Sequence, residues 1–208
     1  MNIENKKTPN FKGYSPLLSG NNDPNGKGDL QEGFEFGWEA LDDKGGGNAR
    51  QEDGVLAGAN VWPPELPAFR VRKLLFPIFA LALDIDENFF EDKTRHSAAL
   101  MRIIHYPDQE GRTDEGVIGI GAHTDWECFT ILWQQPGIQA LQVLNAQKEW
   151  IEAPPIPGTF VVNLGDQLAR WTNDVFKSTV HRVINKSGSR RYSIPLFFGT
   201  DYNVRLEV

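Results

Sequence analysis

The segment from Gly119 to Gln134, GIGAHTDWECFTILWQ, is mostly apolar and aromatic, yet it contains His123 and Asp125 one residue apart. Imidazole nitrogens and carboxylate oxygens both bind divalent metals. On a strand, side chains at i and i+2 project from the same face, so this pair can converge on one point. The pair alone is equally compatible with a hydrogen-bonded pair at a strand end.

A third metal ligand must come from a distant segment, and His181 is the best candidate. His96 lies in a charged helical stretch and His105 alternates with the apolar residues of its strand, so we interpret both as surface or core histidines. His181 occurs in KSTVHRVIN, where Thr179 and Val183 share its strand face. Two histidines and one carboxylate form the facial triad of non-haem Fe(II) oxygenases, although zinc accepts the same ligand types.

Arg191 and Ser193 have a different chemistry from that triad. They stand at i and i+2 in RYSIPLFFG, and a guanidinium beside a hydroxyl can bind both oxygens of a carboxylate, so we call this pair the carboxylate clamp. Arg190 points to the opposite face in this register, so we expect it to be solvated.

Residues 99–208 contain the elements that must position these groups. They hold about eight or nine closely spaced β-like runs without a helical pattern between them, which favours a mainly β fold, a double-stranded β-helix (jelly roll) with flanking helices. The runs are LMRIIHYP, GVIGIGAHTD, ECFTILWQ, IQALQVLN, EWIEA, TFVVNLG, VFKSTVHRVIN, RYSIPLFFG and VRLEV.

Residues 1–98 are predicted to form an irregular and helical N-terminal flank to this core of residues 99–208. They are rich in Gly, Asn and Asp around one aromatic island, GFEFGWE. The apolar run from Leu74 to Leu83 is too short to span a bilayer and predicts a buried helix. FFEDKTRHSAALM, which follows it, also has helical spacing.

The composition narrows the function classes. A chain of 208 residues with 40% hydrophobic residues is typical of one globular domain. A net charge of −7, without basic runs interleaved with aromatics, disfavours nucleic-acid binding and favours a small-molecule partner. The single cysteine, Cys128, and a polar start without a secretory signal predict a cytoplasmic protein with no membrane contact. The sequence does not predict an oligomeric state.

Together these residues resemble the Fe(II)- and 2-oxoglutarate-dependent oxygenases of the isopenicillin N synthase-like family, especially its fungal members. The resemblance covers roughly residues 10–206, through GAHTDWECFTILWQ, GIQALQV, PGTFVVNLGDQLARWTND, KSTVHRVIN and RRYSIPLFFG in family order. It implies that His123, Asp125 and His181 bind Fe(II).

The same resemblance implies a 2-oxoglutarate site. Arg191 and Ser193 would hold the distal carboxylate of this cosubstrate, and Tyr106 would contact it from the first barrel strand. Ile104 stands where the family often has an asparagine, so one polar contact is absent. The chain also lacks N-terminal, central and C-terminal segments that the family usually has, as in a shortened form or a sequence with parts left out.

Aromatic residues are candidates for the wall and mouth of a substrate pocket. Trp126 lies beside the metal ligands and Phe198 at the end of the clamp strand, while Phe34, Phe36 and Trp38 belong to the aromatic island. For each of these residues, packing in the core is the alternative.

The activity that the resemblance implies is oxidation of a small metabolite with O2, commonly a hydroxylation in secondary metabolism, with release of succinate and CO2. Three alternatives remain open. One is an oxidase of the same family whose clamp holds a different carboxylate. Another is an ethylene-forming fragmentation of 2-oxoglutarate. The third is a catalytically silent barrel that acts as a binding module.

Overall fold

The computed structural model describes residues 4–7, 12–22, 28–37, 68–95, 97, 99–108 and 119–207, with side chains of the first helix described from residue 75 on. Two helices, two short 3-10 segments and ten strands form its elements. In chain order they are η1 (Asn5–Lys7), β1 (Gly13–Ser15), β2 (Glu32–Gly37), α1 (Ala68–Ala82), η2 (Glu91–Lys93), β3 (Ala99–Tyr106), β4 (Ile120–His123), β5 (Phe129–Gln134), β6 (Leu141–Leu144), β7 (Trp150–Glu152), β8 (Val161–Leu164), α2 (Asp166–Trp171), β9 (His181–Val183) and β10 (Arg191–Phe198).

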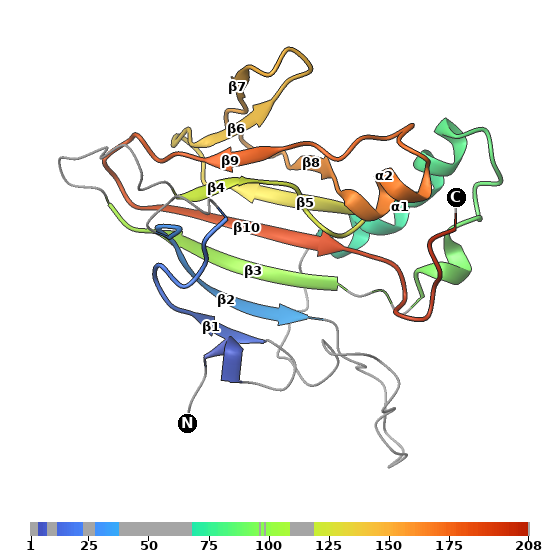
Figure 1. Cartoon of the computed structure of the whole chain (residues 1–208), viewed down its shortest axis with the longest axis horizontal. Coiled ribbons are helices and arrows are strands. Elements are labelled where there is room, and N and C mark those ends of the chain that lie inside the picture. The colour runs from blue at the N-terminus through green and yellow to red at the C-terminus, as the bar shows by residue number, and fades with distance from the viewer. Residues whose placement is uncertain are drawn as a thin grey trace.

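The strands form two antiparallel sheets (Figure 1). The larger has the order β1-β2-β3-β10-β5-β8, and the smaller has the order β4-β9-β6-β7. Neighbours such as β3 and β10 are far apart in sequence, as in a jelly roll. The predicted mainly β, jelly-roll fold class is confirmed.

Strand alternation divides the larger sheet into two faces with different roles. On β10, Arg191 and Ser193 share one face with Phe197, whereas Phe198 projects from the other. The first face turns toward the smaller sheet and supports a buried cluster between the sheets. This cluster consists of Ile104, Tyr106, Ile120, Ala140, Leu141 and Val183.

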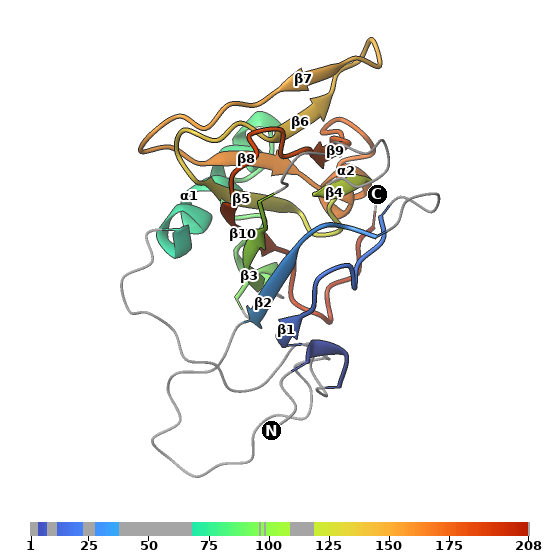
Figure 2. The same cartoon turned by 90° about the vertical axis from the view of Figure 1, so that its left-hand side faces the viewer.

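The outer face of the larger sheet is covered by α1, which lies on the side away from β4 (Figure 2). Phe76 and Ala80 of α1 are buried against it, and Phe76 lies 5.1 Å from Phe129 and 6.0 Å from Phe198 between ring centroids. The helix ends where Asp84 takes a left-handed conformation with φ of 55°. The helix predicted from Leu74 to Leu83 therefore forms and buries one face.

Eight of the nine predicted strand runs contain a strand, but other local predictions were wrong. Residues 204–207 of VRLEV form no strand, and no described strand pairs with them. Among its described residues, FFEDKTRHSAALM forms only the short η2 before β3 begins, because pairing of its last residues with β10 outweighs their helical spacing. The short helix α2 was not predicted.

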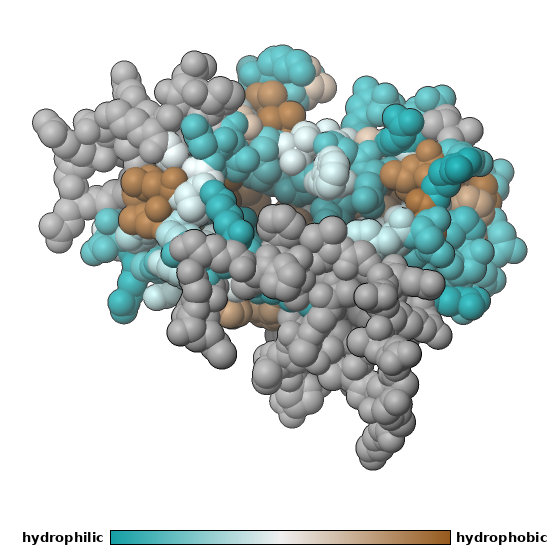
Figure 3. Space-filling model, turned by 60° about the horizontal axis from the view of Figure 1, so that its bottom comes forward, coloured by the Kyte–Doolittle hydropathy of each residue, from teal (hydrophilic) through white to brown (hydrophobic). Residues whose placement is uncertain are grey.

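The N-terminal flank is less irregular than predicted. β1 and β2 extend the larger sheet, and β2 pairs directly with β3 across the expected boundary at residues 98 and 99. That boundary itself remains a prediction. Seen from the side of β1, the described surface is largely polar, with apolar areas toward its two ends (Figure 3). No helix in the described part of the chain is long and apolar enough to cross a bilayer.

Candidate metal and carboxylate site

The structure brings His123, Asp125 and His181 together. His123 ends β4, His181 begins β9, and the two residues are paired in the register of these strands. Asp125 follows β4, and its Oδ1 lies 3.6 Å from Nε2 of each histidine. One ligand atom from each side chain lies within 4.8 Å of the other two, so a single metal ion can contact all three.

The two imidazoles are oriented by backbone carbonyls. Nδ1 of His123 lies 2.7 Å from the carbonyl oxygen of Gly121, and Nδ1 of His181 lies 2.9 Å from that of Thr179. Because a carbonyl only accepts, Nδ1 must carry the proton, which leaves both Nε2 atoms free to bind a metal. Burial and the neighbouring His181 lower the pKa of His123, which favours the neutral ring that a metal requires.

Two further side chains orient Asp125. Its Oδ2 accepts a hydrogen bond from Thr130 Oγ1 and another from Asn163 Nδ2, the latter at 2.7 Å. Both donors contact the same oxygen, so Oδ1 alone faces the histidines. We did not predict these two residues from the sequence, although Thr130 and Asn163 pair across β5 and β8 on the interior face.

The backbone after Asp125 is held by the start of α2. The N–H groups of Asp166 and Gln167 donate to the carbonyls of Asp125 and Trp126 at 2.8 and 3.1 Å. Gly165 allows this approach, because a Cβ there would lie 2.1 Å from the carbonyl oxygen of Glu127. The motif NLGD thus contributes to the position of Asp125.

Two titratable groups beside the triad do not line its cavity. Burial, with a smaller contribution from Asp125, raises the pKa of Glu127 to about 7. Burial and then Glu127 raise the pKa of the Cys128 thiol to about 12. Cys128 is therefore an unreactive core residue.

Arg191 lies in the space between the two sheets, apart from the triad. Its side chain is fully buried, its guanidinium carbon lies 4.9 Å from the centre of the Tyr106 ring, and one nitrogen donates to Gln134 Oε1 at 3.1 Å. Nε and Nη1 are buried without a hydrogen-bond partner among the described residues. A buried, incompletely paired guanidinium is costly, so these donors fit an anion such as a carboxylate.

The other predicted clamp residues lie beside Arg191. Ser193 and Tyr106 are both buried, and the Ser193 hydroxyl lies 3.5 Å from Tyr106 Oη. Ile104 pairs with Ser193 across the strands and adds only an apolar side chain. Gln134 was missed, although it shares the interior face of β5 with Thr130. Arg190 is exposed, as expected.

One cavity joins the triad to Arg191. It is lined by Asn22, Gln31, Arg102, Ile104, Tyr106, Ile120, His123, Asp125, Thr130, Leu132, Leu141, Asn163, His181, Val183, Arg191, Ser193, Pro195 and Phe197. The residues therefore fit a metal ion at one end and a carboxylate at the other. Their roles as ligands of iron and 2-oxoglutarate remain predictions.

The predicted pocket aromatics do not line this cavity. Phe198 projects from the outer face of β10 into the core under α1, and Phe34 and Phe36 share that outer face in the β2–β3 register. Phe197, which alternation from Arg191 places on the interior face, lines the cavity instead. Trp126 is 79% exposed. Trp38 and His96 lie outside the described residues.

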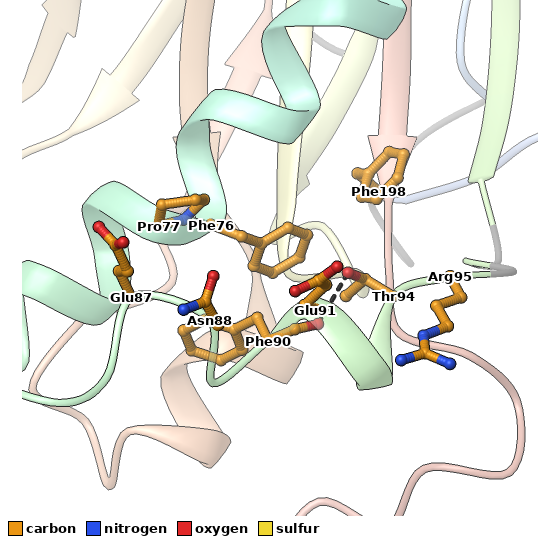
Figure 4. Close-up of a pocket in the computed structure, with 9 residues that line it drawn as sticks. All are labelled: Phe76, Pro77, Glu87, Asn88, Phe90, Glu91, Thr94, Arg95 and Phe198. Carbon is orange, nitrogen blue, oxygen red and sulfur yellow. Dashed lines mark hydrogen bonds between the residues drawn. The ribbon is translucent and has the colours of Figure 1, made fainter.

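A larger cavity lies on the outer face of the sheet. It measures about 520 Å³, against about 70 Å³ for the cavity of the triad, and Phe76, Phe90 and Phe198 contribute its aromatic side chains (Figure 4). Its carboxylates, Glu87 and Glu91, have no histidine beside them in the lining. The chemistry of the site therefore lies in the smaller cavity.

Sequence comparison decides the family. The sequence model of the 2OG-Fe(II) oxygenase superfamily matches residues 97–200, which contain the triad and the clamp. The chain belongs to the 2OG-Fe(II) oxygenase superfamily. This superfamily uses Fe(II), 2-oxoglutarate and O2.

Individual superfamily relatives agree with this assignment. A 2-oxoglutarate-Fe(II) type oxidoreductase, hxnY, of Emericella nidulans is 39% identical over 90% of this chain and 57% of its own length. A homoarginine-6-hydroxylase of Glycine max is 37% identical over 97% of this chain and 65% of its own length. The chain thus spans less than two thirds of either relative.

Two solved structures of a 2-oxoglutarate-binding protein from Neurospora crassa have the same fold. The full-length protein in complex with alpha-KG (2-oxoglutarate) matches with a TM-score of 0.74 and 29% identity, over 99% of this chain and 69% of that one. The second structure contains alpha-KG and thymine, and it matches with a TM-score of 0.72 and 30% identity, over 94% of this chain and 65% of that one.

Proposed function

We propose that this chain is a non-haem Fe(II)- and 2-oxoglutarate-dependent oxygenase that oxidises a small organic molecule, most simply by hydroxylation. The observation that carries this proposal is the placement of the triad and the unpartnered Arg191 donors in one cavity. In the reaction, the substrate C–H, O2 and 2-oxoglutarate give the substrate C–OH, succinate and CO2.

The chain's residues have three tasks in this reaction. The neutral Nε2 atoms of His123 and His181, with Oδ1 of Asp125, would hold Fe(II). Bound Fe(II) and 2-oxoglutarate would supply the activation of O2. Arg191 would pair with the distal carboxylate of the cosubstrate, and the Tyr106 ring, which packs against the Arg191 guanidinium, would help to orient it.

The apolar part of the cavity keeps water from the reacting atoms. Leu132, Leu141 and Val183 line it beside the triad, and Phe197 does so from β10. An interior cavity with this lining suits a small organic substrate rather than a macromolecule. Binding of thymine by the Neurospora crassa protein supports the same class. The cytoplasmic location inferred from the sequence is part of this proposal.

The test is anaerobic addition of Fe(II) and then 2-oxoglutarate to the metal-free protein. We expect a visible charge-transfer band to appear only when both are present, followed by succinate formation when O2 is admitted. If no band forms but O2 is consumed with another carboxylate, the chain is instead an oxidase whose clamp holds a carboxylate other than 2-oxoglutarate. If the protein binds neither iron nor 2-oxoglutarate, it is a silent barrel.

A further inference from the structure

A second polar group lies on the interior face of the larger sheet, away from Arg191. It consists of Arg102 on β3, Glu35 opposite it on β2, and Gln31 just before β2. Arg102 and Gln31 line the cavity that contains the triad. None of the roles described above uses them.

Arg102 and Arg191 start from different places along the interior face of the larger sheet. Arg191 pairs with Tyr106, and Arg102 is four residues away along β3, which separates the two pairs by roughly 13 Å at the rise of a strand. Arg102 is thus available to a second molecule in the cavity.

Glu35 offsets the positive charge of Arg102 and orients its guanidinium. Its Oε1 lies 2.9 Å from Arg102 Nε, and it also accepts hydrogen bonds from Ser15 and Asn5. Because this carboxylate offsets the positive charge, a neutral acceptor suits the remaining donors better than an anion. Nε itself is buried and makes no hydrogen bond within the described part of the chain, so the ion pair with Glu35 leaves the donors of the guanidinium incompletely satisfied.

Gly33 and Gln31 complete the arrangement. A Cβ on Gly33 would lie 3.6 Å from Arg102 Nη2, so the guanidinium lies over the backbone of Gly33, which has no side chain. Gln31 lies just before β2 and lines the same cavity, and its buried Oε1 has no hydrogen-bond partner among the described residues. A buried acceptor without a partner is costly, so an N–H donor on a ligand would be bound favourably here.

We propose that Arg102 and Gln31 recognise the substrate, as a small planar neutral molecule that presents a carbonyl acceptor beside an N–H donor, such as a cyclic amide. The carbonyl accepts from the Arg102 Nη groups, and the N–H donates to Gln31 Oε1. This inference rests on the proposed function, because it places the amide in the cavity of the triad. A purely structural Arg102–Glu35 pair would bind no such molecule.

The test uses 2-pyridone as the probe, with N-methyl-2-pyridone and benzoate as comparisons. Each is equilibrated by anaerobic dialysis with full-length protein loaded with Fe(II) and 2-oxoglutarate. We expect 2-pyridone to bind the parent in about the millimolar range, given its size. Arg102→Lys, Gln31→Leu, or methylation of the probe nitrogen should each weaken binding at least about tenfold. The exposed Arg190→Lys serves as the matched control and should bind like the parent.

Arg102→Lys keeps a cation opposite Glu35, so we expect its unfolding midpoint to stay near that of the parent. If Arg102→Lys unfolds, 2-pyridone binding by Gln31→Leu still tests the proposal. The proposal is overturned if the parent binds no 2-pyridone, if both variants bind it like the parent, or if benzoate binds more tightly through Arg102. The charge-transfer band is recorded in the same samples. A parent with the band but without 2-pyridone binding contradicts this subsite alone, whereas absence of the band contradicts the proposed function.

Discussion

At the scale of single residues, the two oxygens of Asp125 have different environments. Oδ2 accepts from Thr130 and Asn163, and Oδ1 faces both histidine Nε2 atoms. A carboxylate anchored in this way presents one oxygen in a fixed direction, which is what a monodentate metal ligand requires. Hydrogen bonds to metal-binding side chains commonly tune affinity in this manner.

Removing a triad ligand should abolish tight iron binding while the fold survives. In His181→Ala we expect less than about a tenth of the parent's Fe(II) content after gel filtration, by metal analysis, because no other described side chain stands ready to replace it. His105→Ala, which alters a histidine paired with Glu32 outside the cavity, is the control and should retain iron. Full iron occupancy in His181→Ala would overturn the metal assignment.

The residues that orient Asp125 should affect iron more mildly. Thr130→Val and Asn163→Leu each remove one donor to Oδ2, and we expect each to weaken Fe(II) binding about tenfold to a hundredfold. The dissociation constant is measured by competition with a chelator of known affinity. Parent-like constants in both variants would show that these hydrogen bonds do not position the ligand.

At the scale of the elements, close packing of α2 against the loop after β4 sets the position of Asp125. In Gly165→Ala the new Cβ meets the carbonyl oxygens of Glu127 and Asp125 at 2.1 and 2.8 Å, so the backbone must shift. We expect the free energy of unfolding to fall by about 1–3 kcal/mol and the iron affinity to fall with it. Urea denaturation and the chelator competition measure the two effects.

Gly137→Ala provides the contrast. Gly137 has a φ of 81°, but a Cβ there would meet nothing within 4 Å. Its substitution should therefore lower stability through backbone strain and leave the iron affinity unchanged. Equal iron affinities for the two alanine variants would contradict the role given to α2.

The three strands β1, β2 and β3 are linked by ionisable groups on the outer part of the sheet. The hydrogen bond from Tyr14 and then that from His105 lower the pKa of Glu32. A carboxyl whose pKa is lower in the folded state adds stability above about pH 4.5, and that stability is lost as the pH falls through the folded value.

Metal-free parent protein should therefore lose more stability than Glu32→Gln between pH 5 and pH 3, because the glutamine does not titrate. Urea denaturation at several pH values across this window measures the difference. Since Glu32 is partly exposed, we expect the difference to be small. A Glu32→Gln profile parallel to that of the parent would show that this carboxyl does not couple to folding.

At the scale of the whole molecule, the site exists only where the two sheets face each other. The triad histidines come from the smaller sheet and Arg191 comes from the larger one. Alternation along single strands predicted the pairs His123 with Asp125 and Arg191 with Ser193, since the period of a strand is local. The same alternation, continued along β10 from Arg191, also predicts that Phe197 faces the interior between the sheets and that Phe198 faces outward.

Other features of the site carry no local signal. Thr130, Asn163 and Gln134 are neutral residues on strands, and their partners lie 5 to 57 residues away in the sequence. The six residues of α2 are too few to show a helical period. β2 forms through pairing with β3, and β1 through pairing with β2, rather than through their own propensity. Tertiary contacts decide these elements.

The most direct test of the central claim concerns Arg191, whose buried donors have no partner among the described residues. 2-Oxoglutarate is titrated anaerobically into Fe(II)-loaded parent, Arg191→Lys and Arg191→Met, and the charge-transfer band is followed. Arg191→Lys keeps the charge without the planar fork and Arg191→Met loses both, so affinity should fall in that order. Each lost charge-assisted hydrogen bond weakens binding by roughly tenfold to a hundredfold, while iron binding stays unchanged. If Arg191→Met binds 2-oxoglutarate as tightly as the parent, Arg191 does not hold the cosubstrate and the account is wrong.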